Sequence, residues 1–280
     1  YLTPALGHIR LDELAPEHVE RVLTDLKRRG LSAHTRTYTR ATLRRALAIA
    51  EKRGYLARNV ARLVEPPETP RPKLDDTPTV EEMRLLMKAA KTSRLHAYFL
   101  TLAVGLRPSE ALALQWSAVD LDKGSVTVSR TLQRMRDGRG IVAGVPKTQR
   151  SRRTVLLPGI VVDALREHRS RQLDDRAGAE HWEDNDPVFA TAHGTPIDQR
   201  NAARDFQKVC DLAGVPRRRQ YSLRHAAATL PLEAGARLEA VSDALGHANL
   251  AFTKDVYVSR TTALQRQSAD VMDALLRGDA

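Results

Sequence analysis

The 280-residue sequence contains a single cysteine, few aromatic residues and no long apolar run. One thiol, Cys210, excludes an intramolecular disulfide and every zinc site that needs several cysteines. Within residues 205–212, Cys210 lies on an apolar helical face, which favours a buried structural thiol. The longest apolar run, residues 97–106, is about half as long as a membrane-spanning helix. We therefore expect no membrane span.

The sequence also lacks a signal peptide, and its first residue is Tyr1 instead of Met. We therefore expect a fragment or a processed form of a soluble, cytoplasmic protein. It has no phosphate-binding loop of the Gly-Lys-Ser/Thr type.

Positive charge is what the sequence has in excess. There are 45 Lys and Arg residues against 34 Asp and Glu, which gives a formal net charge of +11. This balance predicts a polyanionic partner, with nucleic acid ahead of an anionic membrane. The basic residues are spread along amphipathic segments, so the positive surface is expected on the folded body. For any single cluster, an ordinary solvated surface is the alternative.

A proline-rich stretch divides the sequence. Four prolines fall within the seven residues 66–72, where they cannot continue a helix and favour an extended chain. We predict a linker at about 65–76, with a small helical DNA-binding module over 1–74 and a larger domain over 75–280. The apolar content of 42% is enough to build cores for both.

Helices are predicted throughout the first module. Val19, Val22, Leu23 and Leu26 form one helical stripe that ends before Gly30. Residues 56–63 are predicted to form a further short helix.

Between these two helices, a strongly basic one is predicted over residues 32–53. Its inward residues are predicted to be apolar: Tyr38, Leu43, Ala46, Leu47 and Ala50. Its polar face carries arginines that we interpret as a major-groove element, with surface solvation as an equal alternative: Arg36, Arg40 and Arg44.

The second domain is predicted to be mainly α-helical with a small inserted antiparallel sheet. Thr79 and Glu82 fit a capping box at the start of a helix. Residues 97–106 are predicted to form a buried helix, and Pro108 is predicted to start another helix that reaches Trp116. Between residues 118 and 157 the apolar period becomes two, which predicts three strands, at 126–128, 141–145 and 154–157. Further helices are predicted over 158–173, 197–213, 221–234, 237–246, 250–258 and 262–276, with a loop over 184–194.

Three segments of this domain carry basic residues that could take part in catalysis. Arg107 stands at a helix start three residues before Glu110; most such pairs are surface ion pairs, but this segment is apolar, so Glu110 is expected to orient the guanidinium. The basic turn at 145–154 is interpreted as a solvated hairpin tip that contacts phosphates without specificity: Arg150, Arg152 and Arg153. Lys147 differs because it stands at a strand end, from which its ammonium could point into a groove.

The third segment opens the helix at 221–234. Arg224 lies in the first turn, where backbone N–H groups are free, and its guanidinium could bind a phosphate together with Arg107. His225 faces another way and is expected to pack or to support the site. Further on, His247 follows Gly246, and Tyr257 comes ten residues later. Tyrosine, with a pKa of about 10, becomes a nucleophile only where cationic donors surround it.

Together these segments resemble the tyrosine recombinase (phage integrase) family. That family carries a Gly-x-Arg-x-x-Glu segment, a lysine on a β-hairpin, a His-x-x-Arg helix start, a Leu-Gly-His segment and a tyrosine some ten residues later. The corresponding residues occur here in that order: Arg107 with Glu110, Lys147, Arg224, Leu245-Gly246-His247 and Tyr257. The resemblance covers almost the whole chain. Residues 1–70 resemble the family's core-binding domain, and the arm-binding domain of many phage integrases would be absent from this fragment or removed.

The resemblance implies a site-specific recombinase that needs neither metal nor ATP. Tyr257 would attack the scissile phosphate and form a 3′-phosphotyrosyl link, while Arg107 and Arg224 hold the non-bridging oxygens. Lys147 would protonate the leaving 5′-oxygen, and His247 would bind the phosphate or assist proton transfer. The implied partners are double-stranded DNA carrying an attachment or crossover site, a homotetramer assembled on it, and accessory DNA-bending or directionality proteins. The implied source is bacterial or phage-derived, with the protein in the nucleoid.

One position departs from the family pattern. Tyr221 stands where the family has the histidine of His-x-x-Arg, and a phenol is a poor proton acceptor at pH 7. This departure motivates one alternative, a DNA-binding protein of the same fold that does not cleave. A type IB topoisomerase, with the same chemistry but no partner strand, and an unrelated basic helical protein are the others.

Overall fold

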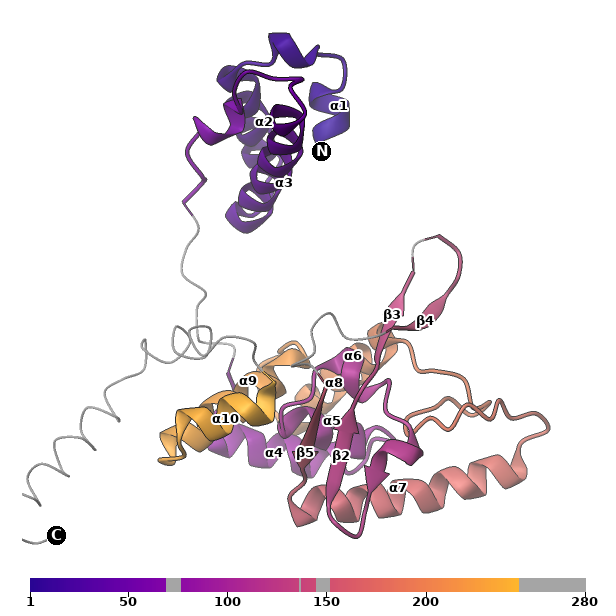
Figure 1. The fold of residues 1–280 in the computed structure, drawn as a ribbon. Helices are drawn as coiled ribbons and strands as arrows, with labels where there is room; N and C mark the ends of the chain where they lie inside the picture. Colours follow the sequence, from indigo (N-terminus) through magenta and orange to yellow (C-terminus); the bar gives the residue numbers. More distant parts are fainter. Residues whose placement is uncertain (69–76, 136, 145–151, 247–280) are drawn as a thin grey trace, which may run out of the picture. The chain divides into compact units, whose positions relative to one another are not determined.

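The computed structural model describes residues 1–68, 77–135, 137–144 and 152–246 (Figure 1). The chain divides into two units, Tyr1–Leu74 and Asp75–Ala280. Four residues named above lie outside the described ranges, as do the helices predicted over 250–258 and 262–276: Lys147, Arg150, His247 and Tyr257.

The first unit is built on two helices, α2 (Pro16–Arg28) and α3 (Ala33–Lys52). The predicted stripe of α2 is confirmed, since Val19, Val22, Leu23 and Leu26 are all buried. Short helical segments complete the unit: α1 (Leu2–Leu6), η1 (Leu11–Glu13) and η2 (Val60–Arg62). The helix predicted over 56–63 is thus only the 3-10 turn η2, whose start is fixed by Asn59 accepting from the Ala61 N–H at 3.1 Å.

The inward face of α3 differs from the prediction. Leu43 and Leu47 are buried, but Tyr38 is 70% exposed and Ala46 is also exposed. Arg40 is only 8% exposed, so its prediction as part of an exposed basic face is wrong. The reason is helical spacing: Arg40 precedes Leu43 by three residues and Leu47 by seven, which puts its aliphatic stem on the buried stripe.

Helices again make up most of the regular secondary structure described in the second unit. The helices are α4 (Val80–Ala90), α5 (His96–Ala103), α6 (Pro108–Ala111), η4 (Trp116–Ala118), α7 (Gly159–Gly178), α8 (Gln199–Ala213), α9 (Tyr221–Glu233) and α10 (Leu238–Leu245). The predicted capping box is confirmed, because Glu82 accepts from the Thr79 N–H at 2.8 Å and Thr79 from the Glu82 N–H at 3.2 Å. Every residue of α5 except its last is buried, as expected for the apolar run.

The helix predicted from Pro108 to Trp116 is much shorter in the structure, because α6 ends at Ala111. Beyond it, the backbone pairs with the loop at 184–194 instead of continuing the helix. Leu114 accepts from the Val188 N–H at 2.9 Å, and the Trp116 N–H donates to Asp186 at 3.0 Å. Tertiary pairing thus replaces the helical bonds that the local sequence favours.

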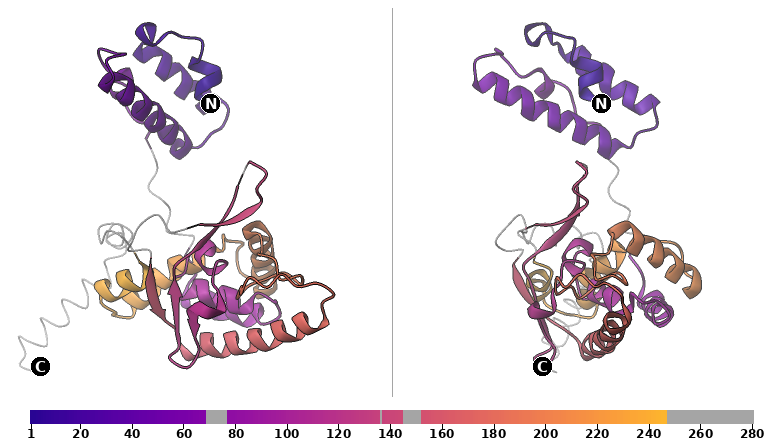
Figure 2. Two further views of the ribbon diagram at one scale, coloured as in Figure 1. Left: turned by 45° about the vertical axis from the view of Figure 1, so that its right-hand side comes forward. Right: turned by 90° about the vertical axis from the view of Figure 1, so that its right-hand side faces the viewer.

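The predicted β-structure is confirmed as antiparallel but forms two sheets. Strands β1 (Val119–Asp120), β2 (Ser125–Val128) and β5 (Arg153–Leu156) pair in the order β1-β2-β5. Strands β3 (Thr131–Arg134) and β4 (Ile141–Gly144) form a ribbon that projects from the rest of this unit (Figure 2). The strands β1 and β3 were not predicted, since neither shows a clear apolar alternation.

The core of the second unit lies between its helices and the three-stranded sheet. Its largest fully buried side chains are aromatic: Tyr98, Phe99, Phe189 and Phe206. Cys210 belongs to this core, and burial raises the pKa of its thiol, which confirms the structural role predicted for it. Among the described residues, no helix is long and apolar enough to span a bilayer.

Candidate active site

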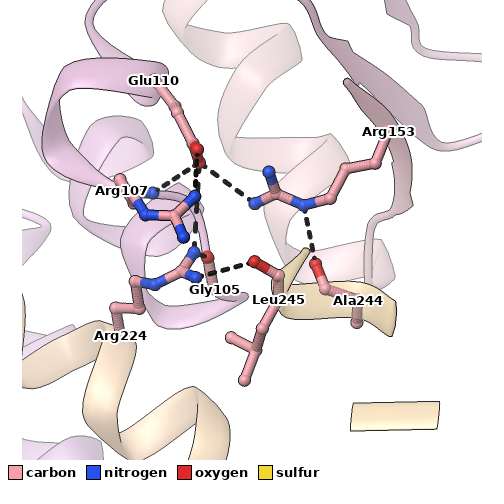
Figure 3. Close-up of polar contacts among 7 residues, drawn as sticks. All are labelled: Gly105, Arg107, Glu110, Arg153, Arg224, Ala244 and Leu245. Carbon is pink, nitrogen blue, oxygen red and sulfur yellow. Dashed lines mark hydrogen bonds and ion pairs between the residues drawn. The ribbon is translucent and has the colours of Figure 1, made fainter. Parts of the chain in front are cut away.

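The carboxylate of Glu110 is the point on which the candidate site converges (Figure 3). Its side chain is 1% exposed, and it comes from α6, one turn after Arg107. Arg107 is the residue before Pro108, which starts the helix, so Glu110 can reach back and accept the Arg107 N–H at 2.9 Å. The other carboxylate oxygen accepts from Arg107 Nη1 at 2.6 Å. The expectation that Glu110 orients the Arg107 guanidinium is confirmed.

Arg153 is the second guanidinium on this carboxylate, and the interpretation of it as a solvated hairpin residue is wrong. Its side chain is only 7% exposed, and Nη2 donates to Glu110 Oε2 at 3.1 Å. A period of two would have identified it, because Arg153 lies two residues before the buried Val155 on β5. Arg152, one residue earlier, is exposed as expected.

Arg224 is the third guanidinium. It comes from the first turn of α9 and is buried. Nη1 lies 4.0 Å from Glu110 Oε2 and donates to the carbonyl of Gly105, and Nη2 donates to the carbonyl of Leu245 at 2.7 Å. Arg107 and Arg224 thus come together across α6 and α9, as the sequence predicted (Figure 3).

Two glycines permit this close assembly. Gly105 has a φ of +103°, and a Cβ there would lie 2.7 Å from Leu245 Cδ2. Gly246 has a φ of +64°, and a Cβ there would lie 2.7 Å from Arg153 Cδ. Both positions therefore require glycine for backbone conformation and for space.

Three guanidiniums face one carboxylate, which leaves two positive charges in excess. Burial alone would raise the pKa of Glu110. Hydrogen bonds from Arg153 and Arg107, together with the positive charge of Arg153, outweigh burial and lower this pKa below its ordinary value. Burial and then the charge of Arg107 lower the pKa of Arg224 to about 10, so its guanidinium stays protonated at neutral pH. Since Arg107 is 33% exposed, the excess charge can be reached from solvent and favours binding of an anion.

Tyr221 and His225 lie next to each other at the start of α9. Their rings are 4.9 Å apart in an edge-to-face arrangement, and Tyr221 is exposed whereas His225 is partly buried. Packing against Tyr221 agrees with the supporting role expected of His225. Among the described residues, no three His, Cys, Asp or Glu side chains are grouped so that they could hold a metal ion.

The sequence matches a known protein family and individual members of it. Residues 78–263 match the model described as the Phage integrase family. The chain is 32% identical over 274 residues to a tyrosine recombinase XerC-like protein of Caldanaerobacter subterraneus subsp. tengcongensis, covering 92% of this chain and 69% of that protein. It is 31% identical over 296 residues to an integrase of Streptomyces ambofaciens, covering 99% of this chain and 73% of the relative.

Solved structures share the fold. The Tn1549 transposon integrase in complex with transposon right end DNA matches with a TM-score of 0.79 and 22% identity, over 96% of this chain and 89% of that one. A lambda integrase dimer bound to a COC′ core site matches with a TM-score of 0.62 and 16% identity, over 93% of this chain and 86% of that one. The predicted tyrosine recombinase architecture is thereby confirmed.

The buried carboxylate predicts a pH-dependent contribution to stability. A carboxyl group whose pKa is lowered by folding stabilises the protein above its unfolded pKa, about 4.3, and this contribution is lost as the pH falls through the folded pKa. Glu110→Gln should therefore lower the free energy of unfolding at pH 7 by about 3 kcal/mol. The difference from wild type should shrink below about pH 4.

Urea unfolding between pH 3 and 8 measures this difference. Trp116 and Trp182 both lie in the second unit, so their fluorescence reports on its unfolding. Glu81→Gln, which breaks an exposed pair with Arg84, is the matched control and should cost less than about 1 kcal/mol. A pH-independent difference, or equal losses in the two variants, would contradict the assignment.

Proposed function

Since the chain belongs to the phage integrase family and is a site-specific DNA recombinase, we propose that Tyr257 cleaves and rejoins DNA through a 3′-phosphotyrosyl intermediate. The observation that supports this best is the pair of guanidiniums, Arg107 and Arg224, near one buried carboxylate. Their positions are fixed before substrate arrives, so little reorganisation is needed when charge develops on a bound phosphate.

In the proposed reaction, the phenolic oxygen of Tyr257 attacks the scissile phosphorus in line with the 5′-oxygen. The bond from phosphorus to the 5′-oxygen breaks as the tyrosyl bond forms, and Lys147 supplies the proton that makes the leaving group a 5′-hydroxyl. Arg107 and Arg224 bind the non-bridging oxygens. Attack by the 5′-hydroxyl of another strand reverses the step, so strands are exchanged without ATP. His247 binds the phosphate or assists proton transfer.

Tyr221 takes a limited part in this proposal. Its exposed phenol stands one turn before Arg224 on the same helix and can donate a hydrogen bond to a phosphate oxygen. It does not accept the proton of Tyr257, which passes to His247 or to water. The positive charge that Arg107 and Arg224 place beside the phosphate, and not a base at position 221, supplies the larger share of the rate.

The DNA contacts are proposed on both units. Residues 1–74 act as a core-binding domain, with Arg44 exposed on α3 and Arg36 partly exposed beside it. On the second unit, Arg150 and Arg152 contact phosphates next to the cleaved bond. Proteins of this fold whose structures contain their DNA support double-stranded DNA as the partner. Assembly of four copies on the crossover site, help from DNA-bending or directionality proteins and action within the nucleoid complete the proposal.

A covalent adduct tests the proposed chemistry. Supercoiled plasmid carrying the DNA that flanks the gene is incubated with the protein in EDTA and stopped with detergent. Because every group assigned is a side chain of this chain, we expect protein to remain linked to DNA without added metal. Tyr257→Phe should abolish the adduct, whereas Tyr221→Phe should slow its formation by less than about tenfold.

Both outcomes of this assay are informative. An adduct that survives in Tyr257→Phe and disappears in Tyr221→Phe would reverse the assignment of the nucleophile. If the protein binds DNA but forms no adduct, on nicked suicide duplexes as well as on plasmid, it is a DNA-binding protein that does not cleave.

Salt dependence tests the electrostatic part of binding. Each phosphate contact that is lost should reduce the slope of log Kd against log salt by about 1. Arg44→Ala should therefore lower this slope by about 1 and weaken binding to all sequences similarly. Arg176→Ala, which removes an exposed arginine paired with Asp184, should leave the slope unchanged. Equal slopes for wild type and Arg44→Ala would exclude Arg44 from the DNA interface.

A further inference from the structure

Arg153 occupies a place in the second unit that the proposed chemistry does not use. It opens β5, where its Cα pairs with that of Val128 on β2, and its side chain points to the same face as Val155. Strand pairing on one side and the core on the other therefore fix the base of this side chain.

The guanidinium of Arg153 joins two other elements. Nη2 donates to Glu110 of α6 at 3.1 Å, and Nε donates to the carbonyl of Ala244 at 3.0 Å, in the last turn of α10 (Figure 3). The Cδ of the same side chain lies 2.7 Å from the place that a Cβ on Gly246 would take. Strand β5, α6 and the end of α10 thus meet at one side chain.

The last turn of a helix has carbonyl groups without helical partners and carries the negative end of the helix dipole. In α10, two guanidiniums satisfy them, Arg153 at Ala244 and Arg224 at Leu245. Arg224 is also assigned to the phosphate, so its position and that of the helix end depend on each other. Arg153 holds the helix end from the opposite side, with Glu110 as its second anchor.

We propose that Arg153 is a positioning residue: it fixes the end of α10 against the Arg107–Glu110 pair and so sets the position of Gly246. This inference rests on the proposed function for its catalytic consequence, since His247 follows Gly246 directly. Arg153 acts through the helix end and through Glu110, and does not itself contact the phosphate.

The test compares variants of Arg153 in single-turnover cleavage at saturating DNA, with Kd for the same duplex measured in parallel. Arg153→Met keeps an unbranched apolar stem but removes both donors, and should slow cleavage by about a hundredfold, as single-donor losses do in preorganised sites, with Kd changed less than threefold. Arg153→Lys can reach only one of the two acceptors and should fall between Met and wild type. Arg176→Met, which removes an exposed arginine from α7, is the matched control and should cleave at the wild-type rate.

Chemical rescue separates positioning from loss of fold. Guanidinium ion at millimolar concentration should restore part of the cleavage rate of Arg153→Ala, whereas the same concentration of KCl should not. Arg153→Met cleaving at the wild-type rate would overturn the proposal. A rate, an affinity and a melting temperature that all fall together, with no rescue, would also overturn it, because Arg153 would then serve only the fold.

Hydrogen exchange keeps this inference independent of the proposed function. Arg153→Met should speed amide exchange in the last turn of α10 by about tenfold or more, while α5 stays protected. If wild type forms no adduct, the proposed chemistry fails, and faster exchange confined to α10 still supports the structural tie. Unchanged exchange in the last turn of α10 would refute the proposal that Arg153 fixes the end of this helix, whether or not the protein cleaves DNA.

Discussion

The buried carboxylate of Glu110 is the constraint on which the candidate site depends. An ionised carboxylate with a side chain 1% exposed is stable only when cations and hydrogen bonds replace water. Here the replacements come from α6 itself, from β5 and from α9, through Arg107, Arg153 and Arg224. The three elements are far apart in the sequence, so the carboxylate acquires its partners only when the second unit has folded. The charge that the fold must neutralise also holds the site together.

The same arrangement explains how a structural ion cluster can serve phosphate chemistry. One carboxylate cannot neutralise three guanidiniums; burial, and after it the charge of Arg107, lowers the pKa of Arg224. In the proposed reaction, a phosphodiester brings a negative charge to this position, and more charge gathers on the same oxygens in the transition state. Because the cations are already fixed, we expect a tyrosine in place of the family's histidine at position 221 to leave this stabilisation intact.

Sequence reasoning identified what local pattern encodes. The helix stripe of α2, the Thr79–Glu82 capping box and the pairing of Arg107 with Glu110 all follow from spacing along the chain. It failed where tertiary contacts decide: α6 ends at Ala111, and the backbone at Leu114 and Trp116 pairs with the loop at 184–194 instead of continuing the helix. It also failed for Arg153 and Arg40, since an arginine in a basic run looks the same in the sequence whether its side chain is exposed or buried. In both cases the apolar period of the helix or strand predicts the burial of the side chain better than its charge does.

A double-mutant cycle on adduct formation tests most directly whether Glu110 acts through the guanidinium it holds. Single-turnover rates are measured for wild type, Glu110→Gln, Arg107→Ala and the double variant on the same saturating duplex. If Glu110 works by fixing Arg107, the double variant loses at least about tenfold less than the product of the two single losses. Losses that multiply would contradict the account, because Glu110 and Arg107 would then contribute to cleavage independently.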